Sequence, residues 1–210
     1  MRYPWWRLAV FATAASAPVY WLYQASAFAL GPDPGKVLVD NLGQGALVLL
    51  LCSLAMSPLQ RFSGWGGWLA ARRQLGLWSF AYASMHLSGY CFFILGLDFA
   101  AIPHELLERP YIALGALGYL GLSALAATST SWSMRRLGRR WKQLHRLTYL
   151  ILVVVLLHML WVVRADLLDW GLYAVIGGLL LLSRASRVQR WLGARQAARR
   201  QRTEKTQINH

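Results

Sequence analysis

Three histidines of this 210-residue chain stand inside an apolar stretch or at its edge: His86 and His158 inside, and His145 at the edge. Ionisable side chains are costly within a bilayer, so each of the three is a candidate functional residue. Two imidazoles from separate helices suit the two axial positions of haem iron, which then serves electron transfer alone. Because the sequence holds no CxxCH motif for covalent attachment, we expect a non-covalent b-type haem.

Other chemistries for these histidines have less support. Zinc usually takes four ligands, and no acid or cysteine pair accompanies the histidines, since Cys52 and Cys91 lie apart in apolar runs. An interhelical hydrogen bond is the simplest alternative for a single membrane histidine, and for His145 both interpretations stay open. His104, in a polar loop, and His210, at the end of the chain, are expected to be solvated and receive no role.

The composition indicates a helical membrane protein. Hydrophobic residues make up 57% of the chain and charged residues 14%, with a mean hydropathy of +0.37, whereas soluble domains carry about 25% charged residues. Runs of about 20 mostly apolar residues predict membrane-spanning helices, and six such runs lie near 8–30, 42–59, 75–97, 111–128, 146–163 and 168–183. We predict an all-α, polytopic bundle of about six transmembrane helices over residues 1–184 and a basic cytoplasmic tail over 185–210. No internal repeat is evident in the sequence.

The basic residues predict the orientation of this bundle. Lys and Arg favour cytoplasmic loops, and with both termini inside, 19 of the 22 basic residues lie on the cytoplasmic side. Only Lys36, Arg109 and Arg164 then lie outside. The formal net charge of +14 is therefore interpreted as a topology signal. Nucleic-acid binding is excluded, because the basic clusters are short and no zinc-finger, RRM or basic-zipper pattern accompanies them.

The same topology predicts which histidines can meet. The helices that carry His86 and His158 run in the same direction, so depth can be counted from their common cytoplasmic end at about 1.5 Å per residue. His86 follows Arg73 by 13 residues and His158 follows Lys142 by 16, which places both about 20 to 24 Å from that end. We therefore expect these two imidazoles to face one another in the outer half of the bilayer.

His145 is expected at the cytoplasmic boundary, without a histidine at its level. Arg73 occupies the equivalent position on the other helix, so a second haem built like the first lacks a ligand. A flavin is another occupant for this inner region, because guanidinium groups bind phosphate in two-pronged fashion. The nearby arginines are Arg72, Arg73, Arg135, Arg136, Arg139 and Arg140.

Three segments resemble the MsrQ (YedZ) family, the haem-binding transmembrane subunits of the periplasmic methionine sulfoxide reductase system, within the ferric-reductase-like transmembrane group. They are RRQLGLWSFAYASMH, ending at His86, RRWKQLHRLTYL, containing His145, and LLHMLWVV, containing His158. The resemblance covers nearly the whole chain. It implies b-type haem and FMN as cofactors, with His86, His145 and His158 matching the family's haem-ligand positions and Arg72 and Arg73 matching its basic pair at the cytoplasmic edge.

The resemblance also implies a place in the bacterial inner membrane and two redox partners. Electrons would come from a cytoplasmic NAD(P)H-dependent flavin reductase and go to MsrP, the periplasmic molybdenum-cofactor subunit. The larger ferric reductases and NADPH oxidases look different, with two histidine pairs and a fused flavin and nucleotide domain. Here the tail is too short for a Rossmann unit and GxGxxG is absent, so a separate partner must supply the electrons.

The sequence thus predicts a membrane cytochrome b that relays electrons outward for the repair of oxidised periplasmic proteins, an electron-transfer subunit rather than a stand-alone catalyst. One competing hypothesis is a cytochrome b that exchanges electrons directly with quinone or ferric iron. A second, from another class, is a transporter or assembly protein whose histidines are structural or carry protons. The lack of mid-membrane carboxylates speaks against proton coupling, although histidine itself can relay protons.

Overall fold

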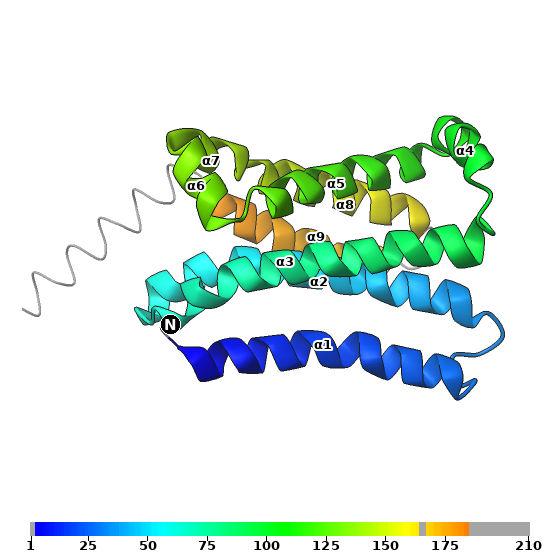
Figure 1. The fold of residues 1–210 in the computed structure, drawn as a ribbon, viewed down its shortest axis with the longest axis horizontal. Helices are drawn as coiled ribbons and strands as arrows, with labels where there is room; N and C mark the ends of the chain where they lie inside the picture. Colours follow the sequence, from blue (N-terminus) through cyan, green and yellow to red (C-terminus); the bar gives the residue numbers. More distant parts are fainter. Residues whose placement is uncertain (1–2, 164–166, 185–210) are drawn as a thin grey trace, which may run out of the picture.

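The computed structural model describes residues 3–163 and 167–184, and this part of the chain forms helices and turns without a strand (Figure 1). The all-α prediction is confirmed; the predicted tail, 185–210, lies outside the described residues. Two short helices of other types, η1 (Tyr90–Ile94, a π-helix) and η2 (Phe99–Ala101, 3-10), follow α3. The α-helices are α1 (Pro4–Ser26), α2 (Pro34–Ser63), α3 (Gly67–Gly89), α4 (Ile102–Glu108), α5 (Pro110–Ala127), α6 (Ser131–Leu137), α7 (Arg139–Leu144), α8 (Leu147–Val162) and α9 (Leu167–Leu182).

Each of the six predicted apolar runs overlaps a helix of the structure, but fewer helices are long and apolar enough to cross a membrane. Among the described residues three pass this test: α2, α5 and the stretch Arg139–Val162. A fourth is added if Gly67–Ile94 and Phe99–Glu108, which meet at 107°, count as one span. The number of these helices therefore indicates a multi-pass membrane protein. Six membrane spans and the N-in/C-in orientation stay predictions.

Two helical hairpins form the centre of the bundle. Helix α2 packs along α3, and α5 packs along α8, while α1 lies against α3 and α9 against α8 and α2. The main core joins the hairpins through leucines and one isoleucine, all under 10% exposed. These are Leu47, Leu50, Leu51 and Leu54 of α2, Leu122 and Leu125 of α5, and Ile151, Leu152 and Leu156 of α8.

Prolines interrupt two of the helices, and side chains from elsewhere in the fold bond the carbonyls that both breaks leave free. A proline has no N–H, so it leaves the carbonyl four residues earlier without its helical partner. Pro18 of α1 frees the carbonyl of Ala14, which accepts a hydrogen bond from the Tyr82 hydroxyl at 2.6 Å. Pro58 of α2 frees the carbonyl of Leu54, which accepts one from the Arg184 guanidinium at 2.7 Å.

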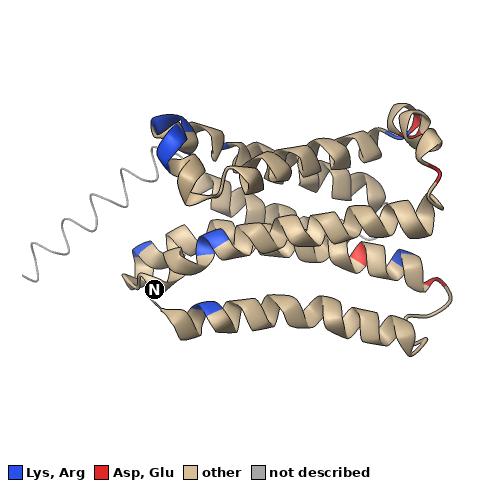
Figure 2. Ribbon diagram, viewed as in Figure 1, with Lys and Arg blue, Asp and Glu red and all other residues tan. Residues whose placement is uncertain are grey.

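Charges separate to opposite ends of the bundle (Figure 2). Arginines gather at the end formed by the starts of α1 and α3 and by α6 and α7. Asp and Glu gather at the other end, at the start of α2 and around α4, where they also pair with basic groups. This is the distribution that the positive-inside pattern predicts for two faces of one membrane.

Candidate functional site

The imidazoles of His86, on α3, and His158, on α8, lie together between the two hairpins, as predicted. Their ring centroids are 6.4 Å apart and their planes cross at 83°. An imidazole nitrogen binds a metal at about 2 Å and lies about 1 Å from its ring centre, so two rings on opposite sides of one metal have centroids about 6 Å apart. The observed separation therefore leaves room for one metal ion between the rings.

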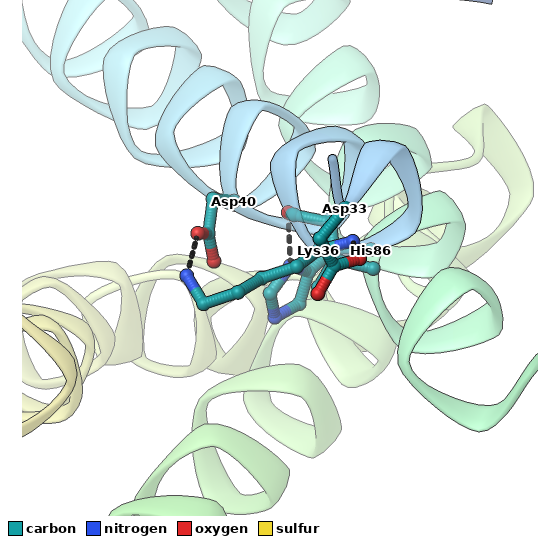
Figure 3. Close-up of polar contacts among 5 residues, drawn as sticks. Asp33, Lys36, Asp40 and His86 are labelled. Atoms are coloured by element: carbon teal, nitrogen blue, oxygen red, sulfur yellow. Dashed lines mark hydrogen bonds and ion pairs between the residues drawn. The ribbon is translucent and has the colours of Figure 1, made fainter. Parts of the chain in front are cut away.

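Each of these rings is held by a backbone carbonyl of the other helix in its hairpin. His86 Nδ1 lies 2.8 Å from the carbonyl oxygen of Val39 (Figure 3), and His158 Nδ1 lies 2.6 Å from that of Tyr111. A carbonyl only accepts hydrogen bonds, so Nδ1 carries the proton and Nε2 keeps its lone pair. Metal-binding histidines almost always donate their second ring N–H in this way.

The two halves of the site are copies of one arrangement, a repeat that the sequence analysis did not find. In each hairpin the histidine follows its carbonyl partner by 47 residues. His158 follows His86 by 72 residues, and Tyr111 follows Val39 by 72. The repeat escapes notice in the sequence because the side chains at most equivalent positions differ, and Val39 and Tyr111 share only the use of their backbone carbonyls.

His145 has different surroundings, at the basic end of the bundle. Its ring stacks on Trp141 at 4.0 Å between centroids, and its Nε2 lies 3.3 Å from the Thr128 hydroxyl. Arg72 lies close enough to interact with it electrostatically, whereas the consecutive Arg73 is exposed. The structure therefore brings one of the two predicted arginines to His145 and leaves the other on the surface.

Arg184 is a residue near this inner region that the sequence analysis missed. Its guanidinium donates to the Tyr149 hydroxyl at 2.8 Å and to the Leu54 carbonyl, and it interacts electrostatically with Arg72. In the sequence it appears only as the first of many basic residues at the end of the chain. The signal that could have singled it out is Pro58, which requires a donor for the Leu54 carbonyl.

The donor set fits haem better than a bare metal ion. Within residues 3–163 and 167–184 no group of three or more His, Cys, Asp or Glu side chains is placed to hold a metal. A zinc ion would thus lack ligands, but a porphyrin brings four nitrogens of its own and needs only two axial ligands. His86 and His158 supply that number.

Comparison with known proteins identifies the family. The model of the family described as ferric reductase like transmembrane component matches residues 42–156, more than half of the chain and most of both hairpins. The chain is also similar to the protein-methionine-sulfoxide reductase heme-binding subunit MsrQ of Yersinia pseudotuberculosis serotype O:1b (strain IP 31758). The two are 42% identical over 183 residues, which cover 86% of this chain and 89% of the relative. The chain therefore belongs to the MsrQ family, within the ferric-reductase-like transmembrane proteins.

Proposed function

We propose that this chain is the haem-binding, electron-transferring membrane subunit of a methionine sulfoxide reductase system. The observation that carries the proposal is the pair His86 and His158, with ring centroids 6.4 Å apart and each Nδ1 bound to a carbonyl. The name of the similar Yersinia protein, a heme-binding subunit, supports it. Haem iron with both axial positions filled exchanges single electrons.

The protein contributes orientation and a fixed proton position to this site. The carbonyls of Val39 and Tyr111 hold the Nδ1 protons, so each Nε2 keeps the lone pair that would bind iron and becomes a better donor. Both rings lie on helices that pack in the hairpin cores, which keeps their positions fixed. This arrangement supports the proposal of a b-type haem held by His86 and His158.

We propose that electrons enter the protein at the basic end of the bundle. His145 and Arg72 would hold the inner redox group, with Arg72 binding the phosphate of FMN and His145 serving as a ligand position or a flavin contact. A cytoplasmic NAD(P)H-dependent flavin reductase would deliver electrons there, and the periplasmic molybdenum-containing subunit, MsrP, would receive them at the acidic end. The separation of charges in Figure 2 supports this direction across the inner membrane.

Visible spectra of the purified protein test the proposal. Wild type should show the sharp reduced α-band of a six-coordinate b-type haem, and His86→Ala and His158→Ala should each abolish it. His104→Ala is the matched control, because that imidazole is exposed and pairs only with Glu108. Loss of the band in His145→Ala would assign a second ligand set to the inner region.

Two experimental results would contradict the proposal, and each would favour one of the two competing hypotheses. A wild type without pigment, after expression with ample haem, would favour a transporter or assembly protein with structural histidines. Full reduction by quinol, with no reduction by flavin reductase and NADH, would favour direct exchange with quinone.

A further inference from the structure

Each imidazole of the site packs against a glycine of the neighbouring helix in its hairpin. A Cβ atom added to Gly43 of α2 would lie 2.8 Å from His86 Nδ1, and one added to Gly115 of α5 would lie 2.9 Å from His158 Cε1 and 3.1 Å from Nδ1. Real Cβ atoms essentially never come within 3.0 Å of a neighbour. Any other residue at these positions would therefore have to displace the ring.

The position of each glycine relative to the carbonyl explains this contact. Gly43 follows Val39 by four residues, and Gly115 follows Tyr111 by four. In an α-helix the carbonyl of residue i is bonded to the N–H of residue i+4, whose Cβ is tilted toward the helix N-terminus and covers that carbonyl. Glycine at i+4 leaves the carbonyl open to a second donor from another helix.

We propose that Gly43 and Gly115 are positioning residues for the two haem ligands. Each exposes one carbonyl to one histidine Nδ1 and admits the ring against the helix, and together they set the 83° angle between the imidazole planes. This inference rests on the proposed function, because it assigns the rings to a metal. It predicts that alanine at either position changes haem binding and the orientation of the histidine rings, while the helices still pack as in wild type.

The same helices offer matched controls. A Cβ on Gly45 of α2 would meet the Tyr82 ring of α3 at 2.6 Å, and one on Gly121 of α5 would meet Ile151 of α8 at 2.7 Å. These contacts are as tight as those at the histidines and lie between the same pairs of helices. Alanine at Gly45 or Gly121 therefore shows how much a steric clash inside the hairpin changes the protein when no histidine of the site is involved.

The experiment compares Gly43→Ala and Gly115→Ala with Gly45→Ala and Gly121→Ala. For each purified protein we would measure haem affinity by titration of the apo-protein and the low-spin EPR signal of the oxidised form, which depends on the angle between the imidazole planes. Loss of a group that orients a metal ligand typically lowers affinity by about 10- to 100-fold. We expect that loss, with a changed EPR signal, in the first two variants and wild-type spectra in the two controls.

A wild-type EPR signal and affinity in Gly43→Ala and Gly115→Ala would overturn the inference while leaving the proposed function intact. Equal spectral changes in the controls would overturn it as well. A wild type that binds no haem would instead refute the proposed function. If Gly43→Ala fails to fold, adding His86→Ala should restore its yield, because the clash is with that ring; a double variant that stays unfolded would also overturn the inference.

Discussion

Arg72 and Arg73 are consecutive residues near the start of α3, but their surroundings differ. An α-helix turns about 100° from one residue to the next, so Arg72 and Arg73 cannot share a face. Arg72 is half-buried and interacts with His145 and Arg184, while Arg73 is exposed. Within the described part of the chain no ion pair to a carboxylate involves Arg72. Of the two arginines, Arg72 is therefore the one to which we assign the phosphate of the proposed FMN.

Arg72→Gln should weaken the retention of FMN, whereas Arg73→Gln should leave it near the wild-type value. A hydrogen bond to a charged group is worth about 1.5 to 3 kcal/mol, which corresponds to roughly 10- to 100-fold in affinity. Flavin fluorescence of protein dialysed against known FMN concentrations measures the change. Equal retention in the two variants would show that Arg72 does not bind the phosphate.

At the level of helices, contacts to backbone carbonyls join neighbouring elements. Prolines free the carbonyls of Ala14 and Leu54, and side chains from α3 and from the end of α9 reach them. Glycines open the carbonyls of Val39 and Tyr111 to the two histidines. Because helix faces in a bilayer gain little from hydrophobic association, such contacts and close packing decide which helices pair.

Tyr82→Phe should destabilise the protein by about 1 kcal/mol, because the buried Ala14 carbonyl loses its donor. In a Pro18→Ala background the same change should cost much less, since residue 18 then supplies the helical N–H. Unfolding in mixed detergent micelles, measured for wild type, both single variants and the double variant, gives the coupling. Strictly additive effects would contradict the repair of the proline break by Tyr82.

Arg184→Met should likewise destabilise the end of α9, by about 1 to 3 kcal/mol, since the Leu54 carbonyl loses a charged donor. The pair Arg184→Met and Pro58→Ala should recover part of that loss in the same unfolding assay. No recovery would mean that the hydrogen bond from Arg184 to the Tyr149 hydroxyl, rather than the one to the Leu54 carbonyl, dominates.

Across the whole molecule, the separation of charge predicts which end faces which compartment. The end with α6 and α7 carries arginines, and the end with the start of α2 carries Asp33 and Asp40. A positive-inside protein has the first end in the cytoplasm. The pair His86 and His158 lies nearer the acidic end, since His86 is 13 residues along from Arg73.

Cysteine labelling tests this orientation. In a background without Cys52 and Cys91, Ala29→Cys should react with a membrane-impermeant maleimide on intact spheroplasts, because Ala29 is exposed at the acidic end. Ser131→Cys, exposed at the start of α6, should react only after the membrane is opened. The reverse result would invert the topology and the proposed direction of electron transfer.

The amino-acid sequence by itself determined the all-helical class, the positions of the apolar helices and the meeting of His86 with His158. Hydrophobic runs and basic clusters report burial in lipid and sidedness, and a constant rise per residue converts spacing into depth. These properties depend on residue type and local count, so no tertiary structure is needed to read them.

Only the tertiary structure decided which backbone groups hold those histidines and which of two adjacent arginines turns inward. Every residue carries a carbonyl, so the types of Val39 and Tyr111 do not mark them, and the repeat of the two hairpins is matched in sequence at few positions, among them His86 with His158 and Gly43 with Gly115. The carbonyls of Val39 and Tyr111 gain their roles because a histidine from a neighbouring helix reaches them. That contact depends on glycines, and the contacts at Ala14 and Leu54 depend on prolines, so none can be assigned before the helices are packed together. The sequence specifies the two histidines, and the packing of the hairpins specifies how their rings are oriented.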